Sequence, residues 1–100
     1  MAGVRSVHVR ISGEVQGVGY RAWTARNAAD LGLAGWVRNC ADGTVEALFR
    51  GAPDAVDEML ARAARGPRYA RVDAVTVLGQ GDDAAAGDDG GAGFVVRRGA

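Results

Sequence analysis

The sequence predicts an α+β domain in which two helices cover one face of an antiparallel sheet. Several segments carry apolar residues at every second position, which is typical of strands with one buried face. Two other segments carry apolar residues three and four positions apart, which is typical of amphipathic helices. The 100 residues, 48% hydrophobic and 24% charged, are enough for a single domain over 1–100 with one core.

A glycine-rich corner joins the first predicted strand to the first predicted helix. Apolar and polar residues alternate over 7–12, which predicts the strand. Apolar and small residues then recur at helical spacing over 21–31, and Gly32 is suited to end the helix in the left-handed conformation. Because the apolar face of this helix consists mostly of small residues, we expect it to lie close to a sheet.

A hairpin and a second helix follow. Segments 33–39 and 44–50 have strand patterns, and Asp42-Gly43 lies between them. Tight hairpin turns require positive φ, which Asp-Gly adopts easily, so this pair predicts a hairpin turn. The second helix is expected to begin at Pro53, with acidic residues near its start and arginines near its end. Gly66-Pro67 is expected to stop it.

A fourth strand is expected over about 70–78 and a short fifth strand over 94–98. Residues 79–93 between them are almost all Gly, Asp and Ala, so they cannot bury a core and we predict a flexible loop. The acids of this loop lack the spacing of a calcium site. The order β-α-β-β-α-β with a short extra C-terminal strand predicts the ferredoxin-like α/β sandwich, a fold that by itself specifies no function.

The composition excludes several kinds of chemistry. The net charge is zero, so no overall field attracts nucleic acid or anionic membranes. All 12 basic residues are arginine, which excludes a lysine Schiff base or a P-loop lysine. Cys40 is the only cysteine, so the sequence predicts neither a disulfide nor a cysteine zinc site. No segment has the pattern of a signal peptide or of a membrane span, so we expect a cytoplasmic protein.

The segment Gly13-Glu-Val-Gln-Gly-Val-Gly-Tyr-Arg21 is the candidate site. Its glycines allow positive φ, and the start of a helix adds partial positive charge, so backbone N–H groups can face an anion. Arg21 adds a permanently charged, planar guanidinium. A phosphate or carboxylate would then contact Arg21 and the backbone of Gln16, Gly17, Val18, Gly19 and Tyr20. The spacing matches neither the dinucleotide fingerprint nor the Walker A loop, and a tight corner with a surface arginine explains these residues equally well.

Four stretches together resemble the acylphosphatase family. They keep the order and the spacing of that family: the loop 13–21, Leu31-Gly-Leu33, Gly35-Trp-Val-Arg-Asn39 and Asp42-Gly-Thr-Val-Glu46. The resemblance extends over about 4–98 and includes the closing Phe94-Val-Val-Arg97. It implies an enzyme that hydrolyses the carboxyl–phosphate bond of acyl phosphates without a metal or other cofactor, giving a carboxylate and inorganic phosphate.

The resemblance also implies roles for two side chains. In the family, the loop arginine binds the phosphate together with loop N–H groups, and the asparagine that ends the second motif orients the attacking water. By motif position these residues are Arg21, with the backbone of 16–20, and Asn39. The family commonly has Phe where this chain has Tyr20, so the ring is kept. The leaving group of an acyl phosphate is a stable carboxylate, so positioning and charge neutralisation are sufficient for such a transfer.

The other polar and aromatic residues have simpler interpretations. His8 is expected to be exposed, and Cys40 to be a free thiol beside the hairpin. Asp42 is suited to the turn, and Glu46 is expected to be an outward-facing strand residue. Alternation along the strand places Arg38 on the sheet face opposite Asn39. Packing in the core or on the sheet explains the aromatic residues Trp36, Phe49 and Phe94.

Two other classes of function are alternatives to the enzyme. One is a non-catalytic module that binds phosphate or carbamoyl phosphate, as in larger maturation proteins that carry a similar domain at the N-terminus. The presence of both Arg21 and Asn39, and the expected absence of a further domain, favour the enzyme. RNA binding is not expected, because the sequence lacks the exposed aromatic motif and a basic excess. We therefore expect a monomer that acts on a small-molecule acyl phosphate and has no nucleic-acid or membrane partner.

Overall fold

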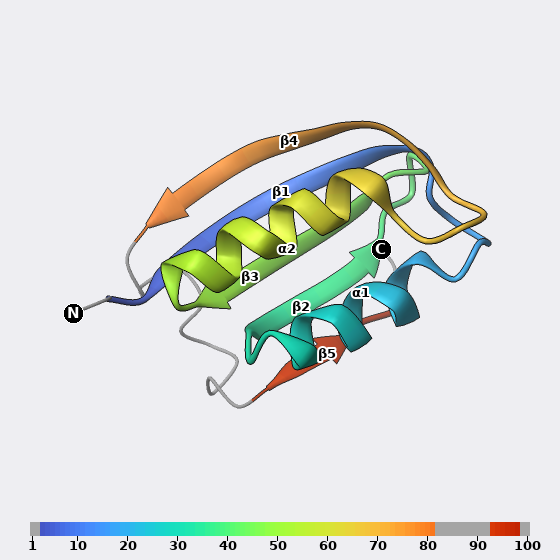
Figure 1. Cartoon of the computed structure of the whole chain (residues 1–100). Coiled ribbons are helices and arrows are strands. Elements are labelled where there is room, and N and C mark those ends of the chain that lie inside the picture. The colour runs from blue at the N-terminus through green and yellow to red at the C-terminus, as the bar shows by residue number, and fades with distance from the viewer. Residues whose placement is uncertain (1–2, 82–92, 99–100) are drawn as a thin grey trace.

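The structure is a computed structural model that describes residues 3–81 and 93–98. Both helices lie on one face of a five-stranded sheet, which confirms the predicted ferredoxin-like sandwich with an extra C-terminal strand (Figure 1). The elements, in chain order, are β1 (Arg5–Glu14), α1 (Tyr20–Asp30), β2 (Ala34–Asn39), β3 (Val45–Gly51), α2 (Pro53–Arg65), β4 (Arg71–Gly81) and β5 (Phe94–Val96).

The strands are arranged in the order β4-β1-β3-β2-β5. The first four pair antiparallel, as expected, but β5 pairs parallel with β2, so the whole sheet is mixed. The direction of β5 follows from where the preceding strand ends. Gly81, the last residue of β4, lies opposite Ser6 near the start of β1, at the end of the sheet where β2 also begins. A strand that starts from this end must run in the same direction as β2.

β4 continues three residues beyond the expected end at Leu78. Gly79, Gln80 and Gly81 pair with residues of β1, so backbone hydrogen bonding to a neighbouring strand outweighs the weak strand propensity of glycine here. The greater part of the predicted flexible loop, residues 82–92, lies outside the described residues.

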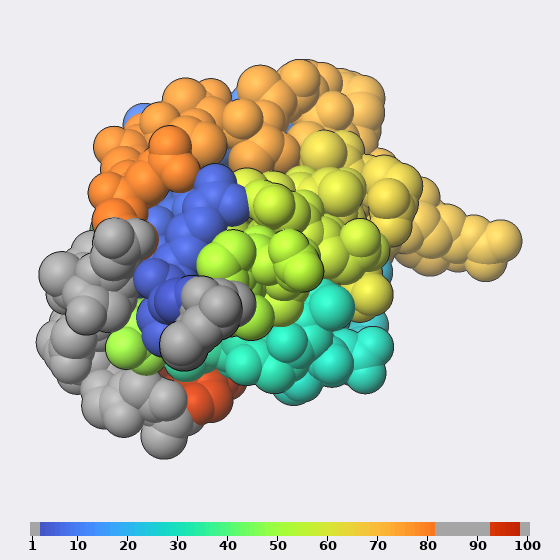
Figure 2. All heavy atoms as spheres, turned by 60° about the vertical axis from the view of Figure 1, so that its left-hand side comes forward, coloured from blue at the N-terminus to red at the C-terminus, as the bar shows by residue number. Residues whose placement is uncertain are grey.

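The connection from α2 to β4 begins where the sequence predicts, at Gly66-Pro67. Residues 66–70 form this connection and project from the body of the molecule (Figure 2). Tyr69 within it is 76% exposed, so its ring contributes little to the core.

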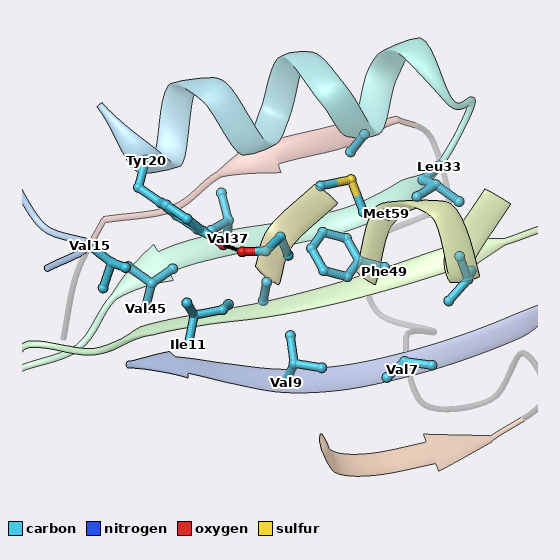
Figure 3. Close-up of a cluster of buried hydrophobic side chains, with 14 residues drawn as sticks. Val7, Val9, Ile11, Val15, Tyr20, Leu33, Val37, Val45, Phe49 and Met59 are labelled. Atoms are coloured by element: carbon cyan, nitrogen blue, oxygen red, sulfur yellow. Dashed lines mark hydrogen bonds between the residues drawn. The ribbon is translucent and has the colours of Figure 1, made fainter. Parts of the chain in front are cut away.

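The core lies between the helices and the sheet (Figure 3). Alternate residues of β1 and β3 face the core. The paired neighbours are buried on both strands: Val7 with Phe49, Val9 with Ala47, and Ile11 with Val45. α2 covers them with the apolar stripe that its sequence predicts, and α1 covers them with a narrower face of mostly small residues. These helical residues are Val56, Met59 and Ala63 of α2, and Tyr20, Thr24 and Ala28 of α1.

Gly35 lets β3 and β5 approach β2 from both sides. It has φ 133°, and a Cβ placed on it would lie 1.9 Å from the carbonyl oxygen of Leu48 and 3.3 Å from Cε2 of Phe94. The Phe94 ring is stacked on Phe49 with the ring centroids 5.7 Å apart, which attaches β5 to the core. Any side chain at position 35 would therefore separate the strands.

The open face of the sheet, away from the helices, carries a buried carboxylate. Glu46 is only 8% exposed. Its cross-strand neighbour Arg38 donates from Nε and Nη2 to Oε1 at 3.0 and 2.7 Å, His8 donates to Oε2, and the Cys40 thiol lies 3.6 Å from Oε1. Burial disfavours the ionised carboxyl, but the hydrogen bonds from Arg38 and His8 and their charges outweigh it, so the pKa of Glu46 is lowered. Glu46 does face away from the core, as expected, but it is shielded from water.

Trp36 also lies on the open face rather than in the core. The guanidinium carbons of Arg38 and Arg97 lie 5.5 and 4.9 Å from the ring centroid, and the His8 ring meets the Trp36 ring edge-on at 5.6 Å. His8, expected to be exposed, is thus only partly exposed. The packing explanation holds for Trp36, on this face, and for Phe49 and Phe94, on the core side.

We expect Gly35→Ala to lower the free energy of unfolding by about 4 kcal/mol or more, because the added methyl group meets backbone that cannot move away. Urea unfolding at pH 7 measures this. Gly43→Ala is the matched control: Gly43 also has positive φ, 92°, but a Cβ there meets nothing within 4 Å. It should lose only about 1–2 kcal/mol from backbone strain. Equal losses in the two variants would contradict the steric argument.

We expect Glu46→Gln to lower the free energy of unfolding at pH 7 by about 2 kcal/mol, because the charged acceptor of several donors is lost. The folded pKa of Glu46 lies below its ordinary value of 4.5, so its contribution is present above that pH and is lost as the pH falls through the folded pKa. The difference between wild type and Glu46→Gln should therefore shrink between about pH 6 and pH 3. Urea unfolding across this range measures it, and a difference that grows toward acid pH would contradict the assignment.

Candidate active site

The glycine-rich loop joins β1 to α1 at the end of the molecule where β2 ends (Figure 1). Val15 at its start is 1% exposed and anchors it in the core. Gly19 is the N-cap of α1 and adopts the left-handed conformation, with φ 81° and ψ 16°. A residue with a side chain would be strained there, so glycine allows the chain to turn directly from the loop into the helix.

The start of α1 leaves backbone donors available. The first intrahelical bond is donated by Trp23 N to Gly19 O at 3.0 Å, and N–H groups before it have no acceptor within the helix. Gly19 supplies no side-chain cap, and the first turn contains no acidic residue. These donors and the positive end of the helix dipole therefore favour an anion at the loop.

Tyr20 fixes the first turn of α1 against α2. Its side chain is buried, its hydroxyl donates to the carbonyl oxygen of Ala63 at 2.9 Å, and its ring centroid lies 5.5 Å from that of Trp23. Burial raises the pKa of the Tyr20 phenol well above its ordinary value, so the phenol stays a neutral donor. The hydroxyl, absent from a phenylalanine, adds a bond between the two helices directly beside Arg21.

Arg21 is half-buried and carries no carboxylate partner among residues 3–81 and 93–98. Its Nη1 donates to the backbone carbonyl oxygen of Arg97 at 3.3 Å. Arg97 N in turn donates to Val37 O at 2.8 Å, so this contact links Arg21 to β2 two residues before Asn39. A neutral carbonyl leaves the charge of the guanidinium available to a ligand.

Asn39 is the last residue of β2, opposite Val45 of β3. Alternation places its side chain on the same face of the sheet as Val37, the face that the helices cover. Its Oδ1 is buried and, within the described part of the chain, accepts no hydrogen bond. A buried acceptor without a donor is costly, so this atom is suited to a water molecule or a ligand.

The side chain of Gln16 connects the loop to the strand end that carries Asn39. Its Nε2 donates to the carbonyl oxygens of Cys40 and Thr44, both at 2.8 Å. The sequence predicts a role in the site only for the backbone of Gln16. The sequence gives no signal for this contact, because the acceptors are backbone atoms 24 and 28 residues away that become neighbours only when the hairpin is placed beside the loop.

The structure thus brings the loop, Arg21 and Asn39 to one end of the sheet through a series of contacts. It does not bring His8, Arg38 or Glu46 there, since they lie on the opposite face. Cys40 contacts both places. Its carbonyl oxygen accepts a hydrogen bond from Gln16 of the loop, while its thiol points toward Glu46 on the open face.

In the described ranges, no three His, Cys, Asp or Glu side chains gather as metal ligands would. None of the helices described is both long enough and apolar enough to cross a membrane.

Comparison with known proteins gives consistent matches. The family model for acylphosphatase matches residues 7–89. An acylphosphatase of Alcanivorax borkumensis is 57% identical over 77 residues, which cover 76% of this chain and 84% of that protein. The crystal structure of acylphosphatase from Bacillus subtilis superposes with a TM-score of 0.84 at 28% identity and covers 93% of this chain and 98% of that one.

A likeness to a larger protein concerns the fold alone. Full-length HypF, in a phosphate- and nucleotide-bound form, matches with a TM-score of 0.79 at 20% identity, over 99% of this chain but only 13% of that one. The family-model match, by contrast, extends over most of this chain and includes the glycine loop, Arg21 and Asn39. The chain belongs to the acylphosphatase family.

Proposed function

We propose that this protein hydrolyses acyl phosphates to a carboxylate and inorganic phosphate. The backbone N–H groups of 16–20 and the guanidinium of Arg21 bind the phosphoryl group, and Asn39 orients the attacking water. The water oxygen forms a bond to phosphorus while the bond between phosphorus and the carboxylate oxygen breaks. The carboxylate leaves with that electron pair, and both protons of the water pass to the product phosphate, which then equilibrates them with the solvent.

The unpartnered, buried Oδ1 of Asn39 is the observation that carries the proposal. An amide oxygen accepts a hydrogen bond from water and so fixes where the lone pairs of the water point. Gln16 ties the next residue, Cys40, to the loop, so a water on Asn39 would lie close to a phosphate bound by that loop. A plain structural corner would gain nothing from an unpaired acceptor at this place.

Charge neutralisation without a general base is sufficient for this substrate class. The carboxylate is a good leaving group, so little proton transfer to it is needed, and transfer of a phosphoryl group depends mainly on positioning and electrostatic stabilisation. Donors fixed by the fold before the substrate arrives need no reorganisation during the reaction. The burial of Val15 and Tyr20 on either side of the loop supports such preorganisation.

We also propose that the protein is a monomer and acts in the cytoplasm. All the residues assigned to the site come from one copy of the chain, so a second copy is not needed to complete it. The contacts of Arg21 and Gln16 are likewise made within the chain. Light scattering at the concentration used for the assays tests the monomer.

We expect Arg21→Gln to lower kcat/KM for benzoyl phosphate by about 100-fold or more, which is the loss typical for one preorganised donor in such a site. Hydrolysis is followed in buffer without added metal. Arg26→Gln is the matched control, since Arg26 is exposed on the same helix, and it should leave kcat/KM unchanged. Full activity in Arg21→Gln would refute the assigned site.

We expect Asn39→Ala to lower kcat by about 100-fold while the inhibition constant of inorganic phosphate stays within about threefold. The reason is that Asn39 contacts the water and not the phosphate. Asn27→Ala, in α1, provides the control for loss of an asparagine side chain with two hydrogen bonds. A parallel loss of turnover and phosphate affinity would contradict this division of roles.

The alternative is a module that binds phosphate or carbamoyl phosphate without turnover. The likeness to HypF extends to the fold only and does not favour it. The same assays separate the two functions: a wild-type protein that binds inorganic phosphate at the loop but hydrolyses no acyl phosphate would support the alternative.

A further inference from the structure

The side-chain amide of Gln16 is the only group, in the described part of the chain, whose side-chain hydrogen bonds join the glycine loop to the β2–β3 connection. Both of its N–H bonds are used, one to Cys40 O and one to Thr44 O, at 2.8 Å each. The side chain is half-buried, so these bonds are partly protected from exchange with water. An apolar side chain of the same length could fill the same space but could make neither bond.

The two acceptors lie at the ends of the turn that follows Asn39. Cys40 N donates to Thr44 O at 2.8 Å, and Gly43 N donates to Cys40 O at 3.1 Å. Each of these carbonyl oxygens therefore accepts one bond from the turn itself and a second from Gln16. The amide thus holds a turn that is already closed, rather than closing an open one, and its removal would leave the hydrogen bonds within the turn in place.

Asn39 lies at the point where the support of the sheet ends. It is the last residue of β2 in the ladder with β3, and Cys40 is already outside the strand. Beyond it, Cys40 is held by the turn, through Cys40 N to Thr44 O, and by the bond from Gln16 to Cys40 O. Arg21 reaches β2 only through Arg97, whereas Gln16 bonds directly to the residue after Asn39 and to Thr44.

We propose that Gln16 is a positioning residue that sets the distance between the bound phosphate and the water on Asn39. The inference rests on the proposed roles of the loop and Asn39. In-line attack needs the water oxygen behind the phosphorus at a short, defined distance, and a displacement of about 1 Å can lower the rate about 100-fold. Loss of the amide would let the loop and the strand end move apart while each remains folded.

A purely structural role for Gln16 makes a different prediction. If the amide only stabilised the loop, its loss would weaken phosphate binding and would lower the rate by the same factor whether or not Asn39 is present. If it positions the phosphate relative to Asn39, its loss should lower kcat, spare phosphate affinity, and have no further effect once the Asn39 side chain has been removed.

The test is a double-mutant cycle with Gln16→Met and Asn39→Ala, measured by benzoyl phosphate hydrolysis and by inhibition with inorganic phosphate. Methionine keeps the length of the side chain and removes both donors. We expect Gln16→Met to lower kcat about 10-fold to 100-fold with phosphate inhibition within about threefold. In the Asn39→Ala background, the same change should alter kcat less than about twofold.

The matched control is Gln80→Met, because Gln80 is an exposed glutamine of β4 that contacts Arg5 and lies outside the site. Its kcat for benzoyl phosphate and its inhibition by phosphate should equal those of the wild type. Gln16→Asn keeps the amide on a shorter side chain that cannot reach both carbonyls. It should show the same loss of kcat with preserved phosphate inhibition, and it replaces Gln16→Met if that variant does not fold.

The outcomes separate the inference from the proposed function. Wild-type turnover with full activity in both Gln16 variants would overturn the inference and leave the function intact. An equal loss of kcat in the presence and absence of Asn39 would also overturn it, in favour of a structural role. Absence of turnover in the wild type would refute the proposed function itself.

Discussion

The antiparallel pairing of β1 with β3 is the constraint on which the rest of the structure depends. Its register places Val7, Val9 and Ile11 beside the apolar residues of β3, so one face of the sheet must be covered by the helices. A shift of one residue would turn the buried side chains to the open face. β2 pairs with β3 in a register that places Asn39 opposite Val45, which itself lies opposite Ile11, so Asn39 lies on the covered face at the end of the sheet where the loop leaves β1.

Much of the fold could be predicted because local patterns agree with tertiary packing. The alternation in β1 and β3, the Asp42-Gly43 turn and the apolar stripe of α2 each indicate the element that the structure contains. The parallel pairing of β5 could not be predicted, because a three-residue strand carries almost no pattern and its direction depends on where β4 ends. The extension of β4 to Gly81 is not visible in the sequence, because it depends on backbone pairing with β1 rather than on side chains.

For the site, the sequence indicates which residues take part but not the contacts that hold them in position. The glycines and Arg21 suggest an anion site, and only the resemblance to a family adds Asn39 to it. The roles assigned to Arg21 and Asn39 stay predictions. The amide of Gln16 and the carbonyl of Arg97 make contacts over 24 and 76 residues of sequence, which no local pattern indicates. The same holds for Glu46, whose neighbours His8, Arg38 and Cys40 come together only when β1, β2 and β3 are side by side.

The contact between Arg21 and the carbonyl of Arg97 has a consequence for the affinity of the site. The guanidinium rests on a neutral acceptor at 3.3 Å, a long hydrogen bond, and not on a carboxylate. In the proposed role of Arg21, a phosphate would exchange a weak neutral bond for charge-assisted ones, and no ion pair would have to be broken first. The carbonyl of Arg97, directly after β5, therefore holds the guanidinium in place without neutralising its charge. The proposed site would therefore bind phosphate without the cost of separating a resident carboxylate from the arginine.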